Sequence, residues 1–517
     1  MRIKNIKDFR KQQVALAVVI LLPVVLLGTI FGTASYLYVE IPSFGMDESK
    51  MPPISAFQLA NYDQLAAMAA FYERRFEDYH MPLNYTVSTL FTSTNYTDVD
   101  KYGFTDNGAL WSATAIAAYV GKFLAARREG NATMEQDALQ VIRRLVHGMS
   151  MMLAVPNGGL GPEYGAILAR MWAAPEHASM PGMPLFNDSV GGARSPYAYY
   201  NGTGLYQNWR YSDFTSLDEY GGYYWGLAIT YKYVDDPWVR STLSLMIDQL
   251  CNGMLQTNFL GIGGFGGPTG VDQKMRFFNA ATWSLLLLKM GSIAYPDKYA
   301  RLYYHFAVEM GYAFFTNEGG AQEIVANYYA YNFGIDVVFG LLLLEDDPTL
   351  RAQYLANFNN GMWSYVKTHR NAHFNAIHLI VNGLDPGEDV YYERDIEDQL
   401  TRFTLTHYPD INGPVTAPGP EYNVVDFAKW QDFFEHHPLG NFMAPFFFEF
   451  ELYTGFYDRP LTVDMCKTRL YIWGGNPFVI PKNNTNILHE NPGLSFLTPY
   501  WLMRGFGFIN ATGVRSV

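Results

Sequence analysis

The chain has 517 residues, with 49 acidic and 36 basic side chains and a formal net charge of −13 at neutral pH. Hydrophobic residues make up 49% of it and aromatic residues 16%, equal to the charged share, which excludes a disordered chain and indicates a large folded body. The acidic balance makes nucleic acid and anionic lipid poor partners.

The first feature along the chain is an uncharged apolar run over residues 14–39, preceded by a tail, residues 1–13, that carries five basic side chains. A run of this length predicts a membrane-spanning helix. The basic flank predicts a cytoplasmic N-terminus, so we expect a single-pass anchor in the cell membrane and an extracytoplasmic main domain. The alternative is a signal peptide cleaved after Ala34, which would leave a secreted protein.

Asn-x-Ser/Thr triplets support export of the main domain, since these are the acceptors of N-linked glycans. They could equally be polar loop residues. The seven candidates are Asn84, Asn95, Asn131, Asn187, Asn201, Asn483 and Asn510.

Residues 40–53 form a short predicted stalk, and helical periodicity then dominates residues 54–517, which show no linker typical of a domain boundary. The predicted helices cover residues 54–79, 106–128, 132–154, 217–234, 237–257, 278–291, 296–315, 324–345, 347–369, 373–381, 393–405, 426–434 and 441–454, with an apolar closing stretch at 494–509. Residues 156–216 and 406–425 are long irregular stretches of the kind that form lids or binding loops. The tail 467–493 is also irregular, with a small β patch expected at 469–473.

Two kinds of helix alternate in this pattern. One kind is apolar on all faces, must be buried on most sides, and starts near Asp106, Asp218, Asn279, Asn327, His373 and Asn441. Most copies are followed by an amphipathic helix with an ordinary solvent face. Six such pairs predict an all-α (α/α)6 toroid, in which an inner ring of helices is surrounded by an outer ring.

Polar side chains gather at the predicted starts of the inner helices, which would open on one face of a toroid. Helix capping alone explains many single members of this set, whereas a pocket of convergent polar groups explains the histidines and Tyr220 better. The expected substrate-binding residues are Asn107, Trp209, Trp225, Arg276, Asn279 and His437.

The strongest candidate for a catalytic segment is Ser212–Gly222, a polar loop that runs into a buried helix. Glycoside cleavage needs a protonated carboxylic acid and a second carboxylate. The sequence predicts Asp106 with Asp218 or Glu219 as this pair. Glu163 and Glu421, in the loops Gly158–Tyr164 and Pro418–Tyr422, are alternative second acids.

Three other sequence patterns are weaker indications of a functional site. Gly261-Ile-Gly-Gly-Phe-Gly266 fits the dinucleotide pattern but has no strand before it, so we expect a loop and no nucleotide cofactor. His369, His373 and His378 are expected to be surface or pocket histidines, with zinc ligation the alternative. Cys251 and Cys466 are the only cysteines and could be one long-range bridge or two thiols. No metal or other cofactor is predicted.

The chain resembles the broad superfamily of (α/α)6-toroid carbohydrate-active enzymes, the six-hairpin glycosidase-like proteins. The resemblance covers about residues 54–510. It is carried by the helix rhythm, by the helix starts Asp106-Asn-Gly and Ser216-Leu-Asp-Glu-Tyr220, and by the closing segment Pro499–Phe508. It implies a carbohydrate ligand and transfers no catalytic residue.

The expected function is therefore that of a membrane-anchored glycoside hydrolase facing outward. One alternative is a polysaccharide lyase or sugar epimerase, with Tyr220 or His373 abstracting a proton and Arg194, Arg210 or Arg276 neutralising a uronic carboxylate. Another alternative is a non-catalytic surface glycoprotein that binds glycans.

Overall fold

The computed structural model of the chain describes residues 47–104, 107–183, 185–186, 199–213, 215–274, 281–316, 328–403, 409–411, 418–425, 436, 453–465, 477–481 and 485–515. This part is mostly helical, as the sequence predicts. The predicted anchor 14–39, the helix 426–434 and most of the helix 441–454 lie outside the described residues. The end of the last of these is wrong as predicted, because residues 453 and 454 begin a strand.

The helices follow the predicted order closely. They are α2 (Tyr62–Arg75), α3 (Gly108–Glu129), α4 (Ala132–Asn157), α5 (Leu217–Tyr233), α6 (Pro237–Gln256), α7 (Ala281–Ala294), α8 (Pro296–Tyr304), α9 (Tyr328–Leu344), α10 (Pro348–Phe358), α11 (Ser364–Val366), α12 (Ala372–Val381), α13 (Val390–Thr401) and α16 (Leu494–Gly505). Asn131, Asp236 and Asp347 each cap the helix that follows by accepting amide hydrogen bonds from its first turn. The predicted helix 54–79 begins only at Tyr62, and the predicted helices 296–315 and 347–369 are each broken into shorter turns.

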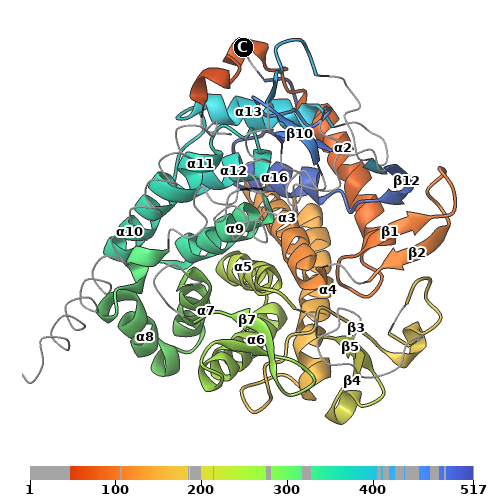
Figure 1. The fold of residues 1–517 in the computed structure, drawn as a ribbon, viewed down its shortest axis with the longest axis vertical. Helices are drawn as coiled ribbons and strands as arrows, with labels where there is room; N and C mark the ends of the chain where they lie inside the picture. The colour runs from red at the N-terminus through yellow and green to blue at the C-terminus, as the bar shows by residue number, and fades with distance from the viewer. Residues whose placement is uncertain are drawn as a thin grey trace, which may run out of the picture.

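Helix α3 is the hub of the packing. Its most extensive contacts are with α16, α5 and α4, while α5 also packs on α9, and α12 contacts both α9 and α16 (Figure 1). Helices α3, α5, α7 and α12 are buried along most of their length, whereas α4, α6, α8 and α10 keep exposed positions. The predicted alternation of buried and half-exposed helices is therefore present in the described pairs.

One helix departs from this alternation. Helix α13 follows the buried helix α12, yet its residues Glu393–Leu400 are buried throughout. Its acidic side chains are covered because arginines pair with them, Arg370 with Asp395 at 2.7 Å and Arg515 with Glu397 at 2.8 Å. Burial of a charged side chain is tolerated when an opposite charge satisfies it.

Helix α3 also has the composition of a membrane span. Among the described residues it alone is long and apolar enough to cross a bilayer, but 89% of its most apolar window is buried inside the fold. It is therefore the central core helix of this domain, and it does not bear on the anchor predicted at residues 14–39.

Short antiparallel strands border the helices. One sheet has the order β2 (Val99–Gly103), β1 (Ser88–Phe91), β12 (Thr485–Glu490), β8 (Pro409–Ile411), and another has β3 (Met171–Ala173), β5 (Arg210–Ser212), β4 (Tyr199–Asn201). A third has β11 (Val479–Pro481), β10 (Tyr453–Tyr457), β9 (Val424–Val425), and β6 (Leu260–Ile262) pairs with β7 (Pro268–Asp272). Strands β3, β4 and β5 lie within the stretch 156–216 that was predicted to be irregular. The β patch expected at 469–473 lies outside the described residues.

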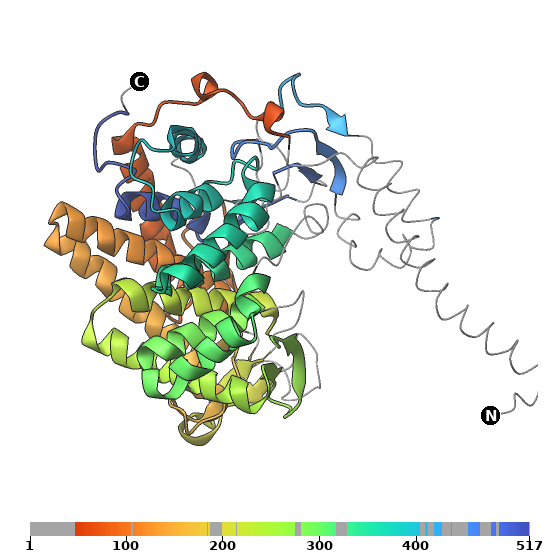
Figure 2. The ribbon, with the colours of Figure 1, turned by 90° about the vertical axis from the view of Figure 1, so that its left-hand side faces the viewer.

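The first and last described segments meet beside α13, at one end of the molecule (Figure 2). The Tyr62 amide donates to the Gly513 carbonyl at 2.8 Å, and the Tyr62 hydroxyl donates to Glu397 on α13 at 2.8 Å. Earlier in the same segment, the Gln58 amide donates to Asp398, and Phe57 packs edge-on against Tyr391. Residues 47–62 therefore form a segment fixed to the domain.

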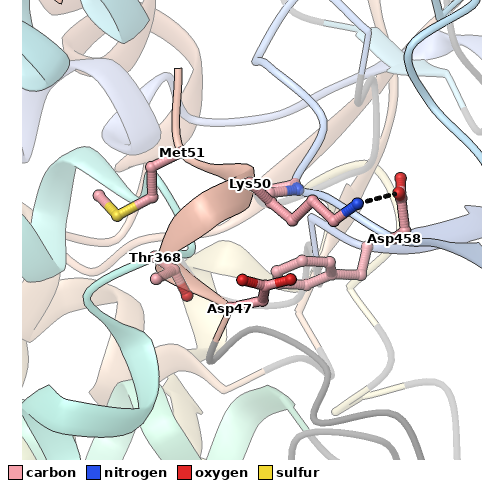
Figure 3. A pocket seen from close by; sticks show the side chains of 7 residues that line it. Asp47, Lys50, Met51, Thr368 and Asp458 are labelled. Carbon is pink, nitrogen blue, oxygen red and sulfur yellow. Dashed lines mark hydrogen bonds and ion pairs between the residues drawn. The ribbon is translucent and has the colours of Figure 1, made fainter. Parts of the chain in front are cut away.

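A small pocket lies where this segment meets the turn after β10 (Figure 3). Lys50 crosses it to pair with Asp458 at 3.1 Å. The lining residues are Asp47, Lys50, Met51, Thr368, Asp458, Pro460 and Phe478. Because Lys50 is paired with Asp458, which also lines the pocket, we interpret the pocket as the place where the N-terminal segment packs on the domain.

Close helix packing generates the first prediction. A Cβ atom on Gly226 of α5 would stand 2.7 Å from the Ala113 Cβ on α3, so Gly226→Ala must push two buried helices apart. Overpacking of this kind costs about 1–3 kcal/mol, and we expect a loss of unfolding free energy in that range by denaturant titration. The matched control is Gly340→Ala on α9, whose nearest neighbour is the flexible end of Leu286 at 3.1 Å. An equal loss in both variants would contradict the packing argument.

Candidate functional site

The described residues place one carboxyl group at the junction of two buried helices. Glu219 lies in the first turn of α5 and has no exposed surface. Its Oε2 atom accepts a hydrogen bond from the Leu110 amide, in the first turn of α3, at 3.1 Å. Its Oε1 atom lies 3.2 Å from Nε of Arg170. The carboxyl group is therefore held between a helix N-terminus and an arginine.

The start of α3 explains why its amides are free for this contact. Asn107 precedes the helix in the left-handed conformation, with φ of 38°, and its side chain makes no capping hydrogen bond. The first amides of a helix have no partner within the helix and favour negative charge. Glu219 fills this role from a neighbouring helix, so the helix starts at Asn107 and at Asp218–Glu219, which the sequence singled out, lie side by side.

Burial shifts the proton affinity of this group strongly. Loss of water raises the pKa of Glu219 to about 7, and this effect exceeds the opposing influence of Arg170. The charge of Asp218 raises the pKa further, and the amides of Leu110 and Ala109 lower it. Glu219 is thus a carboxylic acid that carries its proton for much of the time near neutral pH, the state that a proton donor requires.

A second buried carboxyl group, that of Asp213, lies in the loop before α5. Asp213, which is 5% exposed, accepts a short hydrogen bond from the Gly264 amide at the tip of the β6–β7 hairpin. Burial raises the pKa of Asp213, and the Gly264 hydrogen bond partly offsets this. The glycine-rich segment 261–266, predicted as a loop, is the end of this hairpin, and Asp213 fastens it to the α5 start.

A histidine and an aspartate form a separate pair deeper in the helix packing. His373 Nε2 lies 2.7 Å from Asp336 Oδ1, and neither side chain is more than 2% exposed. Trp225 of α5 meets the His373 ring edge-on, with ring centroids 5.6 Å apart. Burial raises the pKa of Asp336, and the His373 contact lowers it. The pair could hold and pass a proton between α9 and α12.

The remaining predicted site residues are scattered. Tyr220 and Trp225 are fully buried and pack in the core, so neither presents a surface to a ligand among the described residues. Trp209 stacks on Trp172 with centroids 5.4 Å apart, and Glu421 is exposed. Asp218 is half-buried beside Glu219. The predicted residues Asp106, Arg276, Asn279 and His437, with the lyase candidate Arg194, lie outside the described residues.

Two residues of these sites, Arg170 and Asp336, were not predicted from the sequence. Arg170 lies in the stretch 156–216, where no pattern distinguishes it from other polar loop residues. Asp336 did leave a signal, because it is the one acid in the otherwise apolar helix Tyr328–Leu344. An acid on such a helix needs a buried partner, and His373 supplies it.

Metal ligation finds no support in the part of the chain that the structure describes, since no three of its histidine, cysteine or acidic side chains could share an ion. Burial lowers the pKa of His369 to about 3, so this histidine is neutral. Cys251 is a free buried thiol that donates to the Leu287 carbonyl. Cys466 lies outside the described residues.

The glycosylation candidates differ in exposure. Asn95, Asn131, Asn201 and Asn510 are exposed and therefore accessible to modification. Asn84 is half-buried and accepts a hydrogen bond from Arg144, so it is the poorest acceptor among those described. Asn187 and Asn483 lie outside the described residues.

Comparison of the chain with protein-family models, with curated proteins and with solved structures gives no match. The geometry described above is therefore the basis for assigning a function.

The shifted proton affinity of Glu219 predicts a pH-dependent stability. Its pKa is raised from 4.5 to about 7, so between these values the folded protein binds more protons than the unfolded chain. The unfolding free energy must fall as the pH rises through this window, by about 3 kcal/mol from this group. In Glu219→Gln this component disappears. We therefore expect the loss between pH 4.5 and pH 8, measured by denaturant titration, to be smaller than in the wild type.

The matched control for this prediction is Glu163→Gln, since Glu163 is exposed and lies in the loop that precedes Arg170. Its stability profile should run parallel to that of the wild type. Parallel profiles for the wild type and Glu219→Gln would show that Glu219 is ionised at an ordinary pH in the folded protein.

Proposed function

We propose that the protein is a membrane-anchored, extracytoplasmic carbohydrate-active enzyme that hydrolyses glycosidic bonds, with Glu219 as the proton donor. The observation that carries this proposal is the buried Glu219 carboxyl group, which lies between the Leu110 amide and Arg170 and whose pKa of about 7 leaves a large protonated fraction near neutral pH. Departure of a sugar oxygen requires such a protonated acid. The raised pKa follows the general pattern by which enzymes run acid catalysis at neutral pH.

The proposed architecture is an (α/α)6 toroid. It is supported by the alternation of buried and half-exposed helices in the pairs α3/α4, α5/α6, α7/α8 and α9/α10. In this proposal α16 lies between α12 and α3. The predicted sixth inner helix near Asn441 stays a prediction, because it lies outside the described residues.

A second carboxylate must accompany the acid. Consecutive residues of a helix point about 100° apart, so Asp218 and Glu219 do not face the same bond. The same geometry separates Asp213, which lies close to Tyr220, from the Glu219 carboxyl group. Asp106, immediately before the α3 start, stays the partner predicted from the sequence alone.

One observation favours a second candidate function, that of a lyase or epimerase. A histidine oriented by a carboxylate is a general base suited to abstracting a proton. The buried Asp336–His373 pair, at 2.7 Å, supplies this arrangement. Glu219 is equally buried, but residues 216–218 beside it are partly exposed, whereas residues 369–377 around His373 are all buried, so we rank the pair second.

The proposed location limits the substrate. An anchor at residues 14–39 would hold the acidic domain at the outer membrane face. The substrate would then be a glycan that reaches the cell surface or belongs to it.

Activity tests distinguish these functions directly. The full chain in detergent is incubated with a panel of polysaccharides, and new reducing ends are measured together with ultraviolet absorbance of unsaturated products. We expect reducing ends without this absorbance, and a loss of at least about 100-fold in Glu219→Gln, since general acids contribute 10²–10⁴-fold. Asp218→Asn, a neighbouring change of the same kind, should keep most of the activity.

Three outcomes would contradict the proposal of a hydrolase with Glu219 as its proton donor. Unsaturated products that disappear in His373→Gln would favour the lyase. Binding of glycans without any turnover would favour a non-catalytic glycoprotein. Full activity in folded Glu219→Gln would remove Glu219 from the mechanism.

A further inference from the structure

We propose that Arg170 is a positioning residue, which fixes the Glu219 carboxyl group against the start of α3 and sets the pH at which that group loses its proton. The inference rests on the proposed function for its consequence in catalysis. Its electrostatic part concerns Glu219 alone and can be tested without any substrate.

Three contacts fix the position of Arg170 in addition to its contact with Glu219. Its amide donates to the Ser212 carbonyl at 2.8 Å, which continues the pairing of β3 with β5. Its Nη2 atom donates to the Ser216 hydroxyl at 3.2 Å, at the residue preceding α5. Its side chain is 12% exposed. The guanidinium is thus ordered by two of the elements that also carry Asp213 and Glu219.

The third restraint comes from α3. A Cβ atom on Gly108 would stand 2.5 Å from the Arg170 carbonyl oxygen, so only glycine at this position lets the Arg170 backbone lie against the helix start. The same helix start donates the Leu110 amide to Glu219. Gly108 therefore links the position of Arg170 to the position of the amide on the opposite side of the carboxyl group.

Few charges of the described residues act on Glu219, which makes the influence of Arg170 separable. The groups that shift its pKa are Arg170 from the loop before β3, Asp218 from α5 itself, and the amides of Ala109 and Leu110 from α3. Arg170 is the only cation among these groups. Its removal leaves burial and the Asp218 charge unopposed except by amides, so the affinity of Glu219 for its proton must rise.

The direction of the effect on catalysis follows from the role of Glu219 as an acid. Activity is lost on the alkaline side when the acid gives up its proton. A higher proton affinity moves this alkaline limb to higher pH. An arginine with a merely structural role would lower activity at every pH and leave the position of the limb unchanged.

The test compares Arg170→Met, Arg170→Lys and the wild type in the full chain. The titration of Glu219 is followed by infrared difference spectra of its carboxyl band, assigned by its absence in Glu219→Gln. We expect the midpoint to rise by at least about one pH unit in Arg170→Met, the low end for losing a close opposite charge. Arg170→Lys should restore most of the wild-type midpoint. The matched control is Arg240→Met, because Arg240 donates to the Val234 carbonyl at the opposite end of α5 from Glu219 and should leave the midpoint unchanged.

The pH dependence of kcat/KM is the second readout, and its alkaline limb should move by the same amount as the infrared midpoint. An unchanged midpoint in folded Arg170→Met overturns the inference, whatever the activity. A shifted midpoint without turnover on any glycan supports the role of Arg170 and counts against the hydrolase. Where Arg170→Met does not fold, Gly108→Ala displaces the Arg170 carbonyl instead and should also shift the midpoint. An unchanged midpoint in folded Gly108→Ala would then overturn the inference.

Discussion

The close approach of α3 to its two neighbours is the constraint on which the rest of the described structure depends. On one side Gly121 lies so near α16 that a Cβ there would stand 2.6 Å from the Trp501 backbone. On the other side Gly222 and Gly226 of α5 leave no room for side chains against Leu110 and Ala113. Helices packed at backbone distance cannot slide or tilt without losing contacts along their whole length. The first turn of α3 is thereby fixed relative to the first turn of α5, and the Leu110 amide is fixed relative to Glu219.

The environment of each buried acid decides whether it is a structural or a candidate catalytic group. Glu490 shows the structural case, since Arg75 at 2.6 Å and His80 at 3.1 Å both pair with it and its pKa is about 2. Glu219 is buried at least as deeply but lies near one cation, at 3.2 Å, and its pKa is about 7. Arg75 and His80 together outweigh the burial of Glu490, whereas Arg170 alone does not outweigh the burial of Glu219. The described fold thus contains compensated acids such as Glu490 and acids whose compensation is incomplete, among them Glu219, Asp213 and Asp336, and the second kind is typical of functional sites.

The sequence predicted those features that repeat along the chain and missed those that depend on contacts between distant residues. Buried helices such as Gly108–Glu129 and Leu217–Tyr233 were predicted within a few residues, because an apolar stretch with Gly and Ala on all faces fits little else. The burial of α13 was not predicted, since its four acids read as a solvent face until Arg370 and Arg515 are seen to cover them. Glu219 was among the candidates, but its choice over Asp218 required the Leu110 amide and Arg170, neither of which any local pattern reveals.

The fixed N-terminal segment bears on how the domain would sit if the predicted anchor is present. Gln58 and Tyr62 are held by Asp398, Glu397 and the Gly513 carbonyl, and Lys50 pairs with Asp458, so the end of the predicted stalk packs on the domain. Ten residues, 40–49, separate Lys50 from the predicted end of the anchor at residue 39. At about 3.5 Å per residue they span at most about 35 Å, which is less than the width of a domain of this size. A domain tethered so closely can explore few orientations, and its substrate must fit between the protein and the bilayer or approach from the open side.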